Sequence, residues 1–135
     1  MEEQVEAAIR AALIGVGDSV GVAVSGVWRA LVPQDKALPA IVFQVQSALD
    51  VDTHQGRAWI DARYLVKAVT VGYDDADSIL LAAGIDEVLN HKRIEGAGVR
   101  LEDVRRVAPF SSTETRDGKV YRHRGGSYRM MVVLD

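Results

Sequence analysis

The best candidates for metal ligands lie in and just before the turn-rich stretch Asp52–Gly56. Asp50, Asp52 and His54 alternate along the chain. Alternate residues of a strand project to one face, so two carboxylates and an imidazole would converge there as ligands for a divalent metal. The same residue types are typical of the polar end of a hairpin. The hairpin end is the preferred interpretation, and a small metal-dependent enzyme or binding protein remains the alternative.

A second acidic group consists of Asp74, Asp75 and Asp77. Carboxylate oxygens suit a hard cation, but the spacing of an EF-hand loop is missing. Asp74 suits the N-cap of a helix, and Asp77 stands where a capping box places its acidic partner. We therefore predict the start of a helix here.

Histidines and glycines offer no recognisable catalytic or phosphate-binding motif. His54, His91 and His123 are far apart and match neither a Ser-His-Asp nor an HExxH arrangement. Gly15-Val16-Gly17 and Gly96-Ala97-Gly98 both follow helical patterns, whereas a phosphate loop follows a strand, so both are predicted to end helices. We expect no catalytic residue, no bound metal or cofactor, and no enzymatic activity.

The C-terminal third of the chain is basic, while the N-terminal half is acidic. Its cations and tyrosines are Arg100, Arg105, Arg106, Arg116, Lys119, Tyr121, Arg122, Arg124, Tyr128 and Arg129. Such a face on strands suits single-stranded nucleic acid or an acidic protein surface. The net charge of −3 favours the protein surface, and opposite patches on one chain suit head-to-tail pairing, which closes into rings. No specific nucleic-acid binding is expected.

Hydropathy periodicity predicts the elements that position these residues. Val5–Leu13 has the apolar spacing of an amphipathic helix. Val27–Val32 is predicted as a strand, followed by the loop Pro33–Pro39. Ala40–Val51 and Ala58–Val71 alternate, which predicts a hairpin with Ile41, Phe43, Val45, Leu49 and Val51 on one face of its first strand.

The second half of the chain is predicted to form a helix followed by strands. The helix is predicted to run from Asp74 to His91, with cationic residues at its end and glycines after it. Val99–Phe110 is extended, Asp117-Gly118 is a strong turn signal, and two further strands cover Lys119–Arg124 and Ser127–Leu134. Gly125-Gly126 between them is predicted to be a bulge or kink. The fold class is α+β, a mostly antiparallel sheet flanked by two main helices in the order α-β-β-β-α-β-β.

Length and composition limit the number of domains and the classes of protein to which the chain could belong. The 135 residues, 48% of them hydrophobic, suit a single domain, 1–135. No apolar run approaches the roughly 20 residues that cross a bilayer, and acidic residues occupy the start where a signal segment would carry cations, so no membrane partner is expected. Without cysteines the chain has no disulfides and fits a reducing cytosol.

The chain resembles the tail-terminator and tail-completion proteins of long-tailed bacteriophages and related tail-like particles. The resemblance covers nearly the whole chain. It rests on the opening helix Val5–Leu13, the segments VWRALV (27–32), PQDKALP (33–39) and AIVF (40–43), the long strand before helix 74–91, and the closing segments DG (117–118), YRHR (121–124) and YRM (128–130).

The resemblance implies a structural protein without catalytic residues. It implies a hexameric ring that caps the tail tube, ends tail polymerisation and joins the tail to the head-side connector. The partners would be further copies of the chain, the major tail-tube protein and the connector proteins. The location would be the virion tail, and the host cytoplasm during assembly.

Subunit or partner contacts are expected on the polar faces of the strands. The candidates are Asp61, Arg63, Lys67, Arg105, Arg122, Arg124, Tyr128 and Arg129. The loops Pro33–Pro39 and Asp52–Arg57 are further contact candidates, since exposed loops often carry function. A head-tail adaptor or minor tail protein is the alternative role within the same particle.

Overall fold

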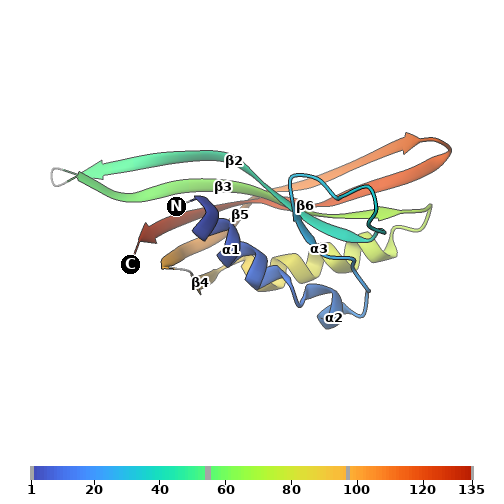
Figure 1. The fold of residues 1–135 in the computed structure, drawn as a ribbon, viewed down its shortest axis with the longest axis horizontal. Coiled ribbons are helices and arrows are strands. Elements are labelled where there is room, and N and C mark those ends of the chain that lie inside the picture. The colour runs from blue at the N-terminus through green and yellow to red at the C-terminus, as the bar shows by residue number, and fades with distance from the viewer. Residues whose placement is uncertain (1, 54–55, 97, 135) are drawn as a thin grey trace.

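The protein is one six-stranded sheet with all its helices on one face (Figure 1). This computed structural model describes residues 2–53, 56–96 and 98–134, and their side chains apart from those of 51–58 and 134. The elements are α1 (Glu2–Leu13), α2 (Val16–Val20), β1 (Val27–Arg29), β2 (Ala40–Thr53), β3 (Gly56–Val71), α3 (Ala76–Leu89), β4 (Lys92–Gly96), β5 (Val99–Arg116) and β6 (Lys119–Leu134). The α+β class with a mostly antiparallel sheet is confirmed.

The strand order is β1-β2-β3-β6-β5-β4, and only the short β1–β2 pair is parallel. Two long hairpins dominate it. The β2–β3 hairpin and the β5–β6 hairpin extend toward opposite ends of the elongated molecule (Figure 1). The predicted hairpin of β2 and β3 is confirmed, and so is the Asp117-Gly118 turn, where both residues have positive φ.

The core lies between the helices and one face of the sheet, which we call the helix face. The predicted apolar stripe of α1 is buried, and α3 adds a second stripe beside it. Alternating residues of β3 supply many of the buried side chains that the sheet contributes to the hydrophobic core: Ile60, Ala62, Tyr64, Val66 and Ala68. In the described part of the chain no helix is long and apolar enough to span a membrane.

A bulge in β2 overturns one predicted face. Val45 pairs with Tyr64, but the next pair is Ser47 with Arg63, so Gln46 is an extra residue. Because side chains alternate with period two, the bulge reverses the faces beyond it. Leu49 therefore points away from the helices and is 64% exposed. The expectation that it shares a face with Ile41 and Phe43 is wrong.

Of the two glycine-rich segments predicted to end helices, only the first follows a helix end. Helix α1 ends at Leu13, two residues before Gly15, and Gly15 is also the N-cap of the short helix α2, which the periodicity does not predict. Helix α3 ends at Leu89, and His91 has positive φ. Lys92 therefore begins strand β4 instead of extending the helix. Gly96 is the last residue of that strand, and Gly98, with φ +81°, precedes β5.

Three other boundaries differ from prediction. Strand β1 stops at Arg29, because Ala30 has φ +64°. The N-cap of α3 is Asp75, while the Oδ1 of Asp74 accepts the Ala76 N–H at 2.9 Å. Strand β6 runs through Gly125-Gly126 in unbroken register with β3, so the bulge predicted there is absent. The irregular positions lie on β5, between Glu102 and Arg105 and between Arg106 and Ala108.

Candidate interaction surfaces

The face of the sheet away from the helices, which we call the outer face, has an ion pair at its centre. Asp61 on β3 accepts hydrogen bonds from Arg129 on β6, at 2.9 Å from Nε and 2.6 Å from Nη2. Asp61 pairs with Met131 in the register of β3 and β6, so it lies diagonally across from Arg129 on the same face, within reach of the bidentate contact. The hydrogen bonds from Arg129 hold the pKa of Asp61 below its usual value.

Two further predicted contact residues flank this pair. Arg63 and Arg105 are the direct cross-strand partners of Arg129, on β3 and β5. Arg105 Nε lies 2.7 Å from Asp103 Oδ1, and both side chains are more than half exposed. Arg63, Arg129 and Arg105 thus form a cationic row across three strands, with Asp61 and Asp103 beside it.

Lys67 also lies on the outer face, but it is half-buried. Its Nζ stands 5.6 Å from the centre of the Phe110 ring. The register explains this contact, because Gly125 separates Lys67 from Phe110 and carries no side chain. Burial lowers the pKa of Lys67, opposed by the charge of Glu114. Glu114 in turn lies 3.1 Å from His123 Nε2, which lowers the pKa of Glu114.

Arg122 and Arg124 lie on the helix face and fix the start of α3. Arg122 donates to the carbonyl oxygens of Gly72 and Tyr73. Arg124 Nη2 lies 2.9 Å from Asp75 Oδ2. A hydrogen bond from Ser78 and these arginines lower the pKa of Asp75. Both arginines are therefore engaged within the chain.

Tyr128 is part of the core. Its side chain is 1% exposed, and its hydroxyl donates to Asp86 on α3 at 3.0 Å. Burial, followed by the charge of Asp86, raises the pKa of Tyr128. The prediction of a single Arg/Tyr face is thus wrong for this residue, since strand alternation puts Tyr128 on the face opposite Arg129.

These contacts show that most cations of the C-terminal third stabilise the fold. Most of its arginines have acidic or carbonyl partners inside the chain: Arg100, Arg105, Arg106, Arg122, Arg124 and Arg129. The remaining cations of this third, Arg116 and Lys119, flank the turn of the β5–β6 hairpin. The described residues give neither of them an ion pair or a hydrogen bond to a carboxylate.

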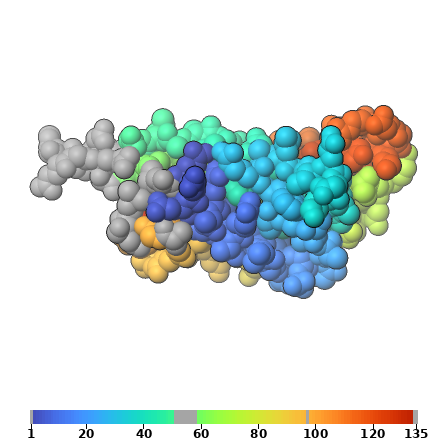
Figure 2. Space-filling view, in the orientation of Figure 1, coloured from blue at the N-terminus to red at the C-terminus, as the bar shows by residue number. Residues whose placement is uncertain are grey.

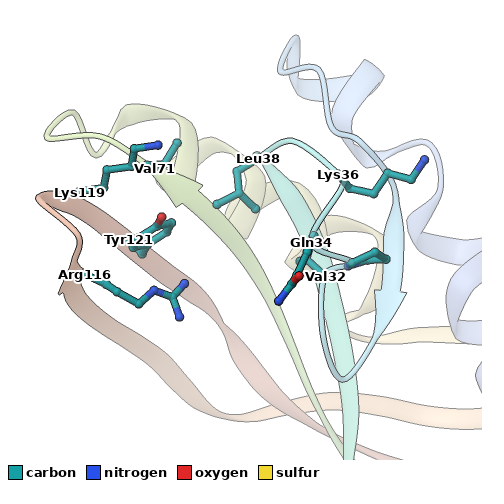
Figure 3. A pocket seen from close by; sticks show the side chains of 9 residues that line it. Val32, Gln34, Lys36, Leu38, Val71, Arg116, Lys119 and Tyr121 are labelled. Carbon is teal, nitrogen blue, oxygen red and sulfur yellow. The ribbon is translucent and has the colours of Figure 1, made fainter.

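A groove lies between that hairpin end and the loop 30–38. We call it the tip groove. It consists of two adjoining hollows of about 650 and 430 Å³, which share Val32, Gln34, Leu38, Arg116 and Tyr121. Figure 2 shows the loop and the hairpin end at the same end of the molecule. In Figure 3, Leu38 and Val32 on one side face Tyr121 and Arg116 on the other.

One wall of this groove contains a contact segment predicted from the sequence, and the other wall does not. The loop Pro33–Pro39 was a predicted contact segment. Arg116 and Lys119 were counted with the cationic third but were not nominated. The Asp117-Gly118 turn was the available signal, because a two-residue turn places its flanking side chains next to each other.

The acidic candidates have structural roles where they are described. In the described part of the chain no group of three His, Asp or Glu residues is placed to hold a metal. His54 and the side chain of Asp52 lie outside the described residues, so the cluster of Asp50, Asp52 and His54 stays a prediction. Asp74 and Asp75 cap and anchor α3.

Two long strand edges lack a partner within the described residues. Strand β1 covers only Ile41–Phe43 of β2, leaving 44–53 open on that side. Strand β4 covers only Val99–Val104 of β5, leaving 105–116 open. The order of the sheet puts these stretches on opposite edges. Unpaired N–H and C=O groups make such edges templates for another strand.

The fold also occurs in a solved virion structure. No protein-family model matches the chain, and no curated protein matches it. A solved chain described as "Virion of native gene transfer agent (GTA) particle" superposes with a TM-score of 0.76. The match covers 98% of this chain and 96% of that chain at 16% identity. The two chains therefore share one fold over their whole lengths.

Proposed function

We propose that this protein is a structural component of a virion tail. Six copies would form a ring that caps the tail tube, ends its polymerisation and joins it to the head-side connector. The observation that carries the proposal is the end-to-end likeness to a chain of a gene transfer agent virion. The sequence resemblance to tail terminators supports the same role independently.

The free edges of the sheet support a ring. The open stretches of β2 and β5 differ in sequence and lie on opposite edges of the sheet, so pairing one with the other joins unlike surfaces of two copies. An interface between unlike surfaces is head-to-tail, and it closes into a ring when the rotation per copy divides a full turn. In this proposal, 44–53 of one copy lies against 105–116 of the next.

Charges at these edges favour the same arrangement. The open part of β5 begins with Arg105 and Arg106. The open part of β2 has Asp50 and Asp52 in its sequence. Opposite signs on the two edges favour head-to-tail contact and disfavour contact between like edges. Arg63 and Arg129 on the outer face lie beside this interface as further contact residues.

The chemistry of the chain agrees with a structural role. Its described carboxylates and arginines mainly stabilise the fold through Asp61–Arg129, Asp75–Arg124 and Arg29–Glu6. The partners we propose are further copies of this chain, the tail-tube protein and the connector. The protein would assemble in the host cytoplasm and remain in the virion tail.

The test is the length of tails assembled without the protein. We expect electron micrographs of the deletion to show tubes longer than normal and not joined to heads, and complementation with the intact chain to restore one length. Tails of normal length that merely fail to join would contradict the terminator role and indicate an adaptor.

A further inference from the structure

The tip groove is a candidate site for a partner that the edges of the sheet do not engage. It lies on the outer side of the molecule at the end opposite the β2–β3 hairpin (Figures 1 and 2). Its walls come from separate parts of the chain, the loop 30–38 and the β5–β6 turn, which meet over β3.

The floor and one wall of the groove are aliphatic. Val42 and Val69 form part of the floor and are nearly fully buried, while Val32 and Leu38 line the loop side. Leu31 stands at the rim and is 80% exposed. A side chain of this size, left in water beside a hollow, favours an apolar group from a partner, because burial removes both surfaces from water.

The opposite wall is cationic. Arg116 and Lys119 are exposed, and neither makes an ion pair or a hydrogen bond with a described carboxylate, although the charge of Arg116 helps to lower the pKa of Glu114. The Arg116 guanidinium lies 4.9 Å from the centre of the Tyr121 ring, which holds it over the groove. Lys67 contributes a third cation from the floor. Carboxylates are the groups that this wall would bind, through charge-assisted hydrogen bonds.

A nucleic acid fits the groove less well. Tyr121 is the aromatic ring of the groove, and Arg116 already covers it, so it offers no free stacking surface. Glu114 and Asp117 also line the groove, so its cations stand at separate points and do not form the continuous positive track that a phosphate backbone follows. An acidic peptide can place its apolar side chain on the aliphatic wall and its carboxylates on the cations.

We propose that the tip groove binds an extended acidic peptide segment of another protein, with an apolar residue anchored against Leu31, Val32 and Leu38 and carboxylates on Arg116 and Lys119. The single observation behind this is the juxtaposition of an exposed aliphatic wall with two unpaired cations. The site is complete in one copy of the chain, so it does not depend on the ring.

The test uses fluorescence anisotropy on the full chain. The probe is a fluorescein-labelled eight-residue peptide with four Glu and two Leu, and the matched peptide has Gln in place of Glu. We expect the Glu peptide to bind and the Gln peptide to bind at least about fivefold more weakly, since each exposed ion pair contributes only modestly to affinity. Affinity should also fall as salt rises.

Variants separate the two walls. Arg116→Gln with Lys119→Gln should weaken binding of the Glu peptide about fivefold, and Leu31→Ser should weaken both peptides. The matched control, Arg10→Gln with Lys92→Gln, removes two exposed cations elsewhere and should leave affinity unchanged. Circular dichroism before each titration establishes that the variants are folded.

Three results would overturn the proposal. The first is absence of binding by the Glu peptide at millimolar concentration. The second is equal weakening by the groove variants and by the control pair. The third is tighter binding of a labelled twelve-nucleotide oligo-dT than of the Glu peptide, which would assign the groove to nucleic acid. None of these outcomes affects ring formation or tail length, so they leave the proposed function to its own test.

Discussion

Single charged residues in this protein mostly stabilise the fold. Asp61 and Arg129 illustrate this, because the register of β3 and β6 brings them together before any partner arrives. The types of these residues could be read from the sequence, and so could their strands. Their pairing could not, because it depends on which strands are neighbours in the sheet.

The first prediction concerns Asp61→Asn. The pKa of Asp61 is lowered in the folded chain, so its contribution to stability is present above its unfolded pKa of about 4 and is lost as pH falls through the folded value. We expect the variant to lower the free energy of unfolding at pH 7 by about 0.5–1 kcal/mol. Urea unfolding measures this.

The same experiment at low pH provides the control. As the pH falls toward 2, the difference between Asp61→Asn and the unchanged chain should shrink, because protonation of the folded-state carboxyl removes its charge interaction with Arg129. The exposed substitution Glu87→Gln should show no such dependence. A gap that is equal at pH 7 and pH 2 would contradict the role given to this pair.

The second prediction concerns Gly125. A Cβ atom there would lie 2.0 Å from the Val66 carbonyl oxygen and 2.6 Å from the Lys67 Cα, both backbone atoms that cannot move aside. Gly125→Ala should therefore cost more than about 3 kcal/mol, beyond ordinary overpacking. Gly96→Ala, whose nearest contact would be 3.9 Å away, should change stability by less than about 0.5 kcal/mol. Chemical unfolding of both variants checks the contrast.

Elements show where sequence periodicity suffices and where it fails. The strands β2 and β3 and the helix α1 were predictable, because each has many residues in one period. Helix α2 has only five residues and begins beside a glycine, so it is too short to show the apolar periodicity of a helix. Strand β4 was missed because His91, Lys92 and Arg93 also suit the last turn of a helix, and only the positive φ of His91 ends it.

The third prediction tests the packing of α2 on α3. A Cβ atom at Gly84 would lie 2.8 Å from Val16 Cγ1 and 2.9 Å from Val20 Cγ1. Alanine favours a helix over glycine by about 1 kcal/mol, while overpacking costs about 1–3 kcal/mol. We expect Gly84→Ala to lower the free energy of unfolding by about 1 kcal/mol in chemical denaturation.

Adding Val16→Ala should partly rescue Gly84→Ala, since it removes one of the two crowded methyl contacts. The double variant should then be more stable than the sum of the single effects predicts. If Gly84→Ala alone stabilises the chain, helix propensity outweighs crowding and the close contact of α2 with α3 is wrong.

At the scale of the whole molecule, the decisive features are the two open edges and the tip groove. Alternation predicted the long strands, but an edge is a property of the completed sheet. The shortness of β1 and β4 leaves 44–53 and 105–116 open. The tip groove joins residues more than 70 positions apart, such as Val32 and Tyr121. No local pattern contains either feature.

The acidic and basic parts of the sequence do not form two separate charged patches in the folded molecule. Folding pairs most of the arginines of the C-terminal third internally and leaves Arg116 and Lys119 of that third at the groove. The net charge of −3 is therefore the sum of ion pairs inside the fold and a smaller number of exposed charges.

Native mass spectrometry of the full chain, from about 1 to 100 μM and across salt concentrations, tests the central claim most directly. The account predicts one closed species of six copies, with no higher polymers, because a ring leaves no open edge. A chain that stays monomeric throughout, or that forms two-fold dimers, would contradict it.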